Sequence, residues 1–122
     1  MKVSIITSCF NRAATIRGAI ESVLAQDYNN IEFIVVDGAS TDGSLEIIRE
    51  YEGRISTIIS EPDHGMYEAI NKGIRLATGD VIGLLHSDDF FYDNGVISRI
   101  VEHMKTTRAD FLYGDGLFVN PD

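Results

Sequence analysis

Along this chain, segments whose apolar residues are spaced as in β-strands alternate with segments whose apolar residues are spaced as in α-helices. Apolar or alternating runs predict five strands, over Val3–Thr7, Ile31–Val36, Ile55–Ser60, Val81–Leu85 and Ala109–Val119. Between them, apolar residues recur every three or four positions and predict helices over 13–25, 44–51, 67–77 and 95–106. Strands that alternate with helices form a parallel sheet with helices on both faces. The order of elements therefore predicts an α/β fold.

Two residues are candidates for the ends of these helices. Asn11 precedes the first helix, where its side chain would cap free N–H groups. Gly79 follows the third helix, at a position where glycine commonly ends a helix. The chain has 122 residues, the size of one domain, and contains no linker or internal repeat. We therefore expect one domain over residues 1–122.

The charge of the chain limits its partners. The formal net charge is −9 at pH 7, which argues against nucleic-acid binding because that needs clustered Lys and Arg. An anionic ligand would be repelled unless a divalent cation or helix N-termini offset the charge. The single cysteine, Cys9, excludes a disulfide within the chain. No apolar run has the length of a signal sequence or a membrane span, so we expect a cytoplasmic domain.

Polar residues follow four of the predicted strands. They are Ser8–Asn11, Asp37-Gly38, Asp63–Gly65 and Ser87–Asp89. In an open parallel sheet, ligands bind at the carboxyl ends of the strands. The sequence therefore predicts a binding site where these four segments meet.

The adjacent acids Asp88 and Asp89 are candidates for a metal site. Two neighbouring carboxylates repel each other unless solvent or a cation screens them. Mg²⁺ and Mn²⁺ prefer such oxygen ligands and often share them with substrate phosphates. Taken alone, the pair is also consistent with a solvated acidic turn that caps the next helix. Acids and aromatics at the other strand ends favour the metal site.

Three further residues at strand ends each have two interpretations. Asp37 can accept a hydrogen bond from an imide N–H such as that of uracil, or it can cap its own loop. Phe10 can stack on a base or pack in the core. Cys9 can be a nucleophile with His64 or His86 as its base, although a free cysteine at a strand end is usually a small packed residue.

Four segments carry a resemblance to a known family: VSIITSCFNRAATI, IEFIVVDGASTDGS, EPDHGMYEAINKGIRLATGD and LLHSDD. In this order the chain resembles family 2 glycosyltransferases with the GT-A fold over essentially its whole length. The resemblance implies a Rossmann-like three-layer sandwich with a mostly parallel sheet. It also implies an inverting transfer of a sugar from a nucleotide-diphospho-sugar, a UDP-sugar, to an acceptor hydroxyl.

The resemblance also implies roles for residues that bind the nucleotide. Phe10 takes the position that stacks on the base, with backbone contacts from Cys9 beside it. Asp37 takes the position that binds the base, and Gly65 and Asn71 match the segment that passes the nucleotide.

The implied metal site lies in Ser87-Asp88-Asp89, which resembles the family's DxD motif. Asp88 would lie near the ribose and the metal shell, and Asp89 would ligate Mn²⁺ or Mg²⁺ directly. The cation would then neutralise the departing nucleoside diphosphate.

Members of the family usually continue well past 200 residues, so the resemblance implies that this chain is the donor-binding half. The acceptor pocket and the general base would lie beyond Asp122. Asp110 and Asp115 are interpreted as surface or strand-end acids, and neither is assigned as the base. Surface left uncovered by the other half would favour a homodimer. By analogy with the family, the acceptor is a saccharide or lipid-linked saccharide in cell-surface polysaccharide synthesis. The full-length enzyme would then associate with the inner face of the membrane.

A non-catalytic nucleotide-sugar binding module is the alternative, since it would have the same site without transfer activity. Two other classes of protein fit less well. A signalling receiver domain needs an acidic pair after its first strand and a lysine after its fifth, but here Cys9-Phe10 follows the first strand and Lys105 is the last lysine. A nucleotidyltransferase usually has a Gly- and Lys-rich entry loop, which this sequence lacks. The dinucleotide fingerprint and the P-loop are missing too.

Overall fold

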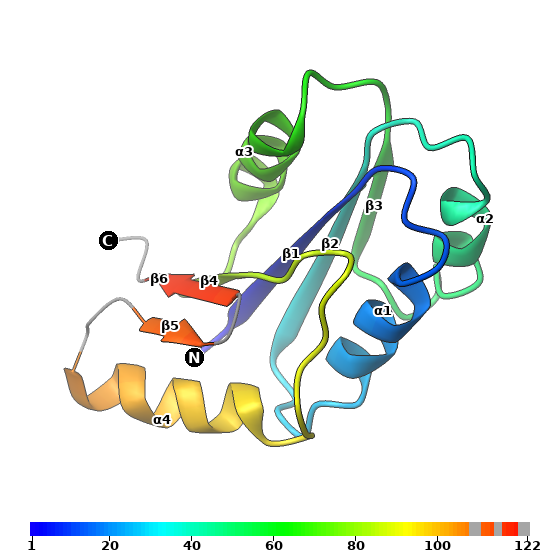
Figure 1. Cartoon of the computed structure of the whole chain (residues 1–122). Helices are drawn as coiled ribbons and strands as arrows, with labels where there is room; N and C mark the ends of the chain where they lie inside the picture. The colour runs from blue at the N-terminus through cyan, green and yellow to red at the C-terminus, as the bar shows by residue number, and fades with distance from the viewer. Residues whose placement is uncertain (108–110, 114–115, 120–122) are drawn as a thin grey trace.

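The structure is a computed structural model that describes residues 1–107, 111–113 and 116–119. Helices and strands follow one another along most of the chain (Figure 1). In chain order they are β1 (Val3–Cys9), α1 (Ile16–Leu24), β2 (Ile31–Asp37), α2 (Ser44–Arg49), β3 (Thr57–Ser60), α3 (Met66–Leu76), β4 (Val81–Leu84), α4 (Val96–Thr107), β5 (Phe111–Tyr113) and β6 (Gly116–Val119).

The strands form one sheet in the order β3-β2-β1-β4-β6-β5. β1, β2, β3 and β4 run parallel to one another, whereas β6 is antiparallel to both β4 and β5. The register pairs Cys9 with Asp37 and Asp37 with Ser60, so the carboxyl ends of β1, β2 and β3 are level. The predicted mostly parallel sheet is confirmed.

Helices cover both faces of the sheet and make three layers. α3 lies on one face, and α1, α2 and α4 lie on the other (Figure 1). The larger core lies under these three helices and includes Ile20, Ile48 and Ile97, each with no exposed surface. The smaller core lies under α3, where Ala69 packs with Ile6 and Ile34. Strands that are buried on both faces explain the nearly continuous apolar runs in the sequence.

The prediction of a single fifth strand over Ala109–Val119 is wrong. The described residues of that segment form two strands, with Phe111 paired to Phe118 and Tyr113 paired to Gly116 in antiparallel register. The sequence Gly114-Asp115 precedes Gly116, the first residue of β6, and this Gly-Asp-Gly composition favours a break between two short strands over one continuous strand. Asp110 and Asp115, interpreted above as surface or strand-end acids, lie outside the described residues.

The predictions that Asn11 caps the first helix and that Gly79 ends the third are both wrong. α1 begins at Ile16 after Thr15 rather than near Ala13, and Asn11 does not cap it. Asn11 instead has a φ of 53° and accepts a hydrogen bond from the Thr41 backbone N–H at 2.9 Å. α3 ends at Leu76, and the extended Ala77 follows it.

Gly79 has a packing role instead. A Cβ on Gly79 would lie 2.5 Å from Ser4 Oγ and 2.8 Å from the Ser4 backbone nitrogen. Glycine is therefore needed here because the start of β4 passes close to β1.

The order in which successive strands join the sheet reverses between β1 and β4. β2 and β3 extend from one side of β1, and the chain then returns through α3 to place β4 on the other side. In α/β sheets a crevice for ligands opens at such a switch point, outside the carboxyl ends of the strands. Among the described helices, none has the length and apolar character needed to cross a membrane.

Candidate nucleotide-binding site

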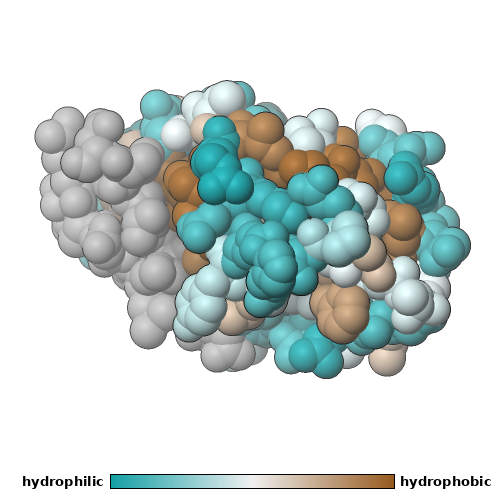
Figure 2. All heavy atoms as spheres, turned by 90° about the horizontal axis from the view of Figure 1, so that it is seen from above, coloured by the Kyte–Doolittle hydropathy of each residue, from teal (hydrophilic) through white to brown (hydrophobic). Residues whose placement is uncertain are grey.

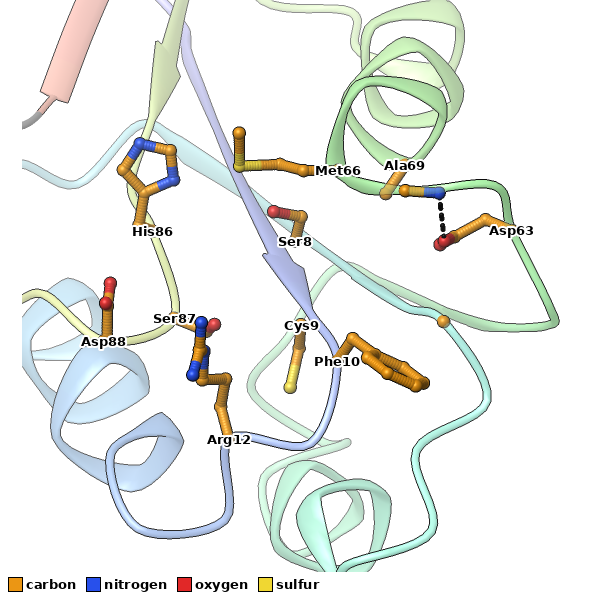
Figure 3. Close-up of a pocket in the computed structure, with 12 residues that line it drawn as sticks. Ser8, Cys9, Phe10, Arg12, Asp63, Met66, Ala69, His86, Ser87 and Asp88 are labelled. Carbon is orange, nitrogen blue, oxygen red and sulfur yellow. Dashed lines mark hydrogen bonds between the residues drawn. The ribbon is translucent and has the colours of Figure 1, made fainter.

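A pocket of about 510 Å³ opens at the switch point between β1 and β4 (Figure 3). This volume falls within the roughly 300–1,000 Å³ that is typical of small-molecule sites. The residues that line it are Ser8, Cys9, Phe10, Arg12, Gly38, Asp63, Gly65, Met66, Ala69, His86, Ser87 and Asp88. They come from the ends of β1, β2 and β4, from the loop before α3, and from α3 itself. The predicted meeting of four strand-end segments is therefore present in the structure.

The face seen from above combines hydrophilic and apolar groups. Figure 2 shows hydrophilic side chains in the middle of this face and apolar side chains at its sides. The pocket has the same mixture, with Phe10 and Met66 more than two-fifths exposed and Asp88 also exposed. Such a lining suits a ligand that has both a flat apolar part and a charged part.

Phe10 and Cys9 occupy the end of β1. The Phe10 ring is 58% exposed, so it is not a core residue, and it lines the pocket where a planar ligand could stack on it. Cys9 is buried, and this burial raises the pKa of its thiol to about 11. Since only a thiolate is a good nucleophile, a thiol with this pKa is not suited to nucleophilic catalysis at neutral pH.

Asp37 is fully buried at the end of β2 and supports the loop that follows. Its Oδ2 accepts hydrogen bonds from the Ser40 N–H at 3.0 Å and from Ser60 Oγ at 2.9 Å, and its Oδ1 accepts one from Ser40 Oγ at 2.5 Å. Asp37 is not among the residues that line the pocket. An ionised carboxylate offers about four acceptor sites, so capacity for a further donor remains. These contacts fit the interpretation of Asp37 as an acid that caps its own loop. That Asp37 also binds the nucleobase of a ligand stays a prediction.

The loop after β1 is tied to the loop after β2. Three consecutive backbone N–H groups of the first loop donate to side chains of the second loop and of the first residue of α2: Asn11 to Ser40 Oγ (2.9 Å), Arg12 to Ser44 Oγ (2.8 Å) and Ala13 to Asp42 Oδ2 (3.0 Å). These bonds explain why α1 begins only at Ile16, because the preceding backbone is held in a non-helical path. They also connect the pocket to Asp37 through Ser40.

The loop before α3 closes against the end of β2. The Asp63 carboxylate accepts a hydrogen bond from the Gly65 N–H at 3.0 Å and lies so near Gly38 that a Cβ there would be 2.9 Å from Asp63 Oδ2. Gly65 has a φ of 126°, a left-handed conformation that favours glycine, and it immediately precedes α3. Gly38 and Gly65 thereby allow this loop to form a wall of the pocket.

The acidic pair lies in the turn after β4. Asp88 is exposed and lines the pocket, whereas Asp89 is half-buried, lies outside the lining and accepts a hydrogen bond from the Phe90 N–H at 2.8 Å. Within the described residues, no group of three or more His, Cys, Asp or Glu side chains is placed to hold a metal by itself. Two carboxylates fit a Mg²⁺ or Mn²⁺ ion whose remaining ligands are substrate phosphates and water.

The structure therefore brings together some of the predicted site residues. Cys9, Phe10, Gly65 and Asp88 all line the pocket. Asp37 and Asp89 lie beside lining residues in the chain, and Asn71 is exposed on α3 outside the lining. The assigned roles of all seven predicted residues remain predictions.

Sequence reasoning missed three residues that line the pocket, namely Arg12, Met66 and Ala69. For Arg12 a signal existed, because it lies just past a strand end in a chain with a net charge of −9. Met66 and Ala69 lie on the first turn of α3, and the sequence pattern offered no reason to select them from the other residues of that helix.

A fold with a Rossmann-like parallel sheet and a pocket at its switch point is the architecture of nucleotide-binding α/β proteins. The model of glycosyl transferase family 2 matches residues 4–122, and this chain belongs to that family.

Curated relatives cover most of this chain. It is 41% identical over 101 residues to an uncharacterised glycosyltransferase of Mycobacterium tuberculosis, covering 82% of this chain and 38% of the relative. It is 33% identical over 116 residues to a PGL/p-HBAD biosynthesis glycosyltransferase of Mycobacterium bovis, covering 92% of this chain and 45% of the relative. The chain thus spans less than half the length of these relatives.

Solved structures of glycosyltransferases share the fold. The mannosyltransferase PcManGT from Pyrobaculum calidifontis, in complex with GDP-Man and Mn²⁺, matches with a TM-score of 0.87 at 20% identity, over 98% of this chain and 44% of that chain. Residues 1–349 of TarS from S. aureus, in complex with UDP-GlcNAc, match with a TM-score of 0.79 at 24% identity, over 86% of this chain and 31% of that chain. The predicted Rossmann-like GT-A fold is confirmed.

Proposed function

We propose that this chain binds the nucleotide-diphospho-sugar donor of an inverting glycosyltransferase, which transfers the sugar to an acceptor hydroxyl. The observation that carries the proposal is the convergence of four strand-end segments on one pocket, with an exposed aromatic ring from β1 and an exposed carboxylate after β4. Membership of glycosyl transferase family 2 supports it. So do two solved neighbours, one in complex with GDP-Man and Mn²⁺ and one with UDP-GlcNAc.

In this proposal the base lies between Phe10 and the loop before α3. Phe10 presents its ring for stacking, and the backbone of Cys9 and Gly65 provides the adjoining walls. Asp37 receives the imide N–H of a uracil after a rotation of its carboxylate toward the pocket. A UDP-sugar is the donor that this arrangement favours.

The other end of the pocket is proposed to hold the diphosphate. Asp88 and Asp89 would bind Mn²⁺ or Mg²⁺, which stabilises the nucleoside diphosphate as it departs with its negative charge. Asp88 already faces the pocket, and Asp89 would use the carboxylate oxygen that does not accept the Phe90 N–H. The acceptor, a saccharide or lipid-linked saccharide in surface polysaccharide synthesis, belongs to the whole enzyme, as does the general base.

A thermal-shift screen tests the proposal. UDP with Mn²⁺ should raise the melting temperature of this chain, because a ligand present at 100 times its Kd stabilises the native state by about 2.7 kcal/mol. For a chain of this size, that free energy corresponds to an increase of roughly 8–15 °C. UDP-, GDP- and dTDP-sugars, each with and without Mn²⁺, identify the base.

The control is the same screen with uridine and Mn²⁺, which should give a much smaller increase because the diphosphate contacts are lost. If no nucleotide at millimolar concentration changes the melting temperature, the pocket is not a donor site.

A further inference from the structure

The pocket contains one strongly basic side chain, and its function is not yet assigned. Arg12 is the only Lys or Arg among the described residues that line the pocket. The chain carries a net charge of −9, and both Asp63 and Asp88 also line the pocket. Among the described residues that line the pocket, Arg12 would therefore provide the main electrostatic attraction for an anionic ligand.

Several basic side chains elsewhere on the molecule are already paired with acids. Arg17 pairs with Glu50 at 2.9 Å, and Arg99 pairs with Asp93 at 3.1 Å. Lys72, on α3, contacts Glu61 at 3.0 Å and Glu68 at 3.6 Å. Within the part of the chain that the structure describes, the guanidinium of Arg12 has neither an ion pair nor a hydrogen bond, although it lines the pocket. All five of its N–H donors remain available for a ligand.

The backbone of Arg12 is held in place from the neighbouring loop. Its N–H donates to Ser44 Oγ at 2.8 Å, and Ser44 Oγ in turn donates to Asp42 Oδ1 at 2.6 Å. The flanking N–H groups of Asn11 and Ala13 are bound in the same way. These hydrogen bonds, first from Ser44 and then from Ala13, lower the pKa of Asp42 and keep it an ionised acceptor. A position fixed in this way reduces the entropy that Arg12 loses when it binds a ligand.

The side chain of Arg12 points into the pocket. Figure 3 shows it rising from the loop after β1 toward Ser87, next to the segment that carries Asp88. Phe10 lies two residues earlier, on another side of the same pocket. A ligand that stacks on Phe10 and extends toward Asp88 would pass the guanidinium.

We propose that Arg12 binds the diphosphate of the donor through its guanidinium and so determines the preference of the site for nucleoside diphosphates over monophosphates. This inference rests on the proposed function, since it assigns a residue to the same pocket. A guanidinium matches the geometry of phosphate oxygens in bidentate contacts. With a cation bound at Asp88 and Asp89, the diphosphate would be held from two separate loops. The Arg12 guanidinium would then offset part of the negative charge of the diphosphate, in addition to the cation.

Calorimetric titration tests the proposal with two ligand pairs, UDP with UMP and GDP with GMP, each with Mn²⁺. Replacing Arg12 by Gln is expected to weaken binding of the diphosphate about 10- to 30-fold, the loss typical of a charge-assisted hydrogen bond. Binding of the matching monophosphate should weaken less than about threefold, because only part of the contact is lost. Arg12→Lys should lie between wild type and Arg12→Gln, because it keeps the charge but loses the planar fork.

The matched control is Arg54→Gln, which removes the same charge at an exposed position outside the pocket lining. It should bind both members of each pair as wild type does. If Arg12→Gln binds diphosphate as tightly as wild type, or loses no more than Arg54→Gln, the inference is overturned while the proposed function stands. If both members of a pair weaken equally, Arg12 does not select the diphosphate, and that too overturns the inference. If wild type binds none of the four ligands, the proposed function fails and the inference with it.

Discussion

Replacing Asp88 and Asp89 together by Asn is expected to abolish the Mn²⁺-dependent part of nucleoside diphosphate binding. Asn keeps the shape of each side chain but removes the negative charge that holds a divalent cation. In wild type, adding Mn²⁺ should tighten binding of the diphosphate; in the double variant, the affinities with and without Mn²⁺ should agree within about threefold, which is near 0.7 kcal/mol. Calorimetric titration with UDP and GDP measures both values.

The fold should survive this double substitution. Asp88 is exposed, and an Asn at position 89 can still accept the Phe90 N–H through its amide oxygen. The control variant, Glu46→Gln with Glu52→Gln, removes the same charge from exposed positions in and just after α2. It should keep the full response to Mn²⁺. A double Asn variant that responds to Mn²⁺ as wild type does would show that these carboxylates do not bind the metal.

Replacing Asp37 by Ala is expected to destabilise the fold and to weaken nucleotide binding. The carboxylate is fully buried and accepts hydrogen bonds from the half-buried Ser40 and Ser60, so its removal leaves these donors without their partner. Losses of this kind cost about 1–3 kcal/mol for each unsatisfied group. We expect the free energy of unfolding to fall by roughly 2–4 kcal/mol in all. Urea unfolding measures this change.

The effect of Asp37→Ala on binding follows from the same contacts. Ser40 also holds the N–H of Asn11 at 2.9 Å, so a disturbed Ser40 releases the loop that carries Phe10 and Arg12. Asp80→Ala is the control, since Asp80 is exposed and accepts a hydrogen bond from the Lys2 N–H at 2.8 Å. Its free energy of unfolding should change by less than about 1 kcal/mol. If Asp37→Ala is no less stable than Asp80→Ala, the structural role assigned to Asp37 is wrong.

The strands were predictable from the sequence because burial on both faces requires unbroken apolar runs. Val81–Leu85, for example, differs by only one residue from the observed β4. The site was predictable to the extent that chain order determines sheet order. Once Ser8–Asn11 and Ser87–Asp89 follow adjacent parallel strands, their side chains must share one edge of the sheet.

Other features depend on contacts between distant segments, which no local pattern contains. The start of α1 moved from Ala13 to Ile16 because residues around 11–13 bind side chains of the 40–44 loop. Gly79 resembled a helix end because it follows the last apolar residue of the helical pattern, but its role is a close approach to Ser4. Likewise, Asp37 was correctly placed at a strand end, yet the direction of its carboxylate is set by Ser40 and Ser60.

The pocket at the carboxyl ends of β1, β2 and β4 is proposed to be the donor site, and every role assigned to Phe10, Arg12 and Asp88 depends on it. A crystal structure of this chain with UDP and Mn²⁺ tests it most directly. We expect a base stacked on Phe10, a diphosphate within hydrogen-bond distance of Arg12 and a metal ion ligated by Asp88 or Asp89. A nucleotide bound elsewhere on the molecule, with the pocket lined by Phe10 and Asp88 filled only by solvent, would contradict it.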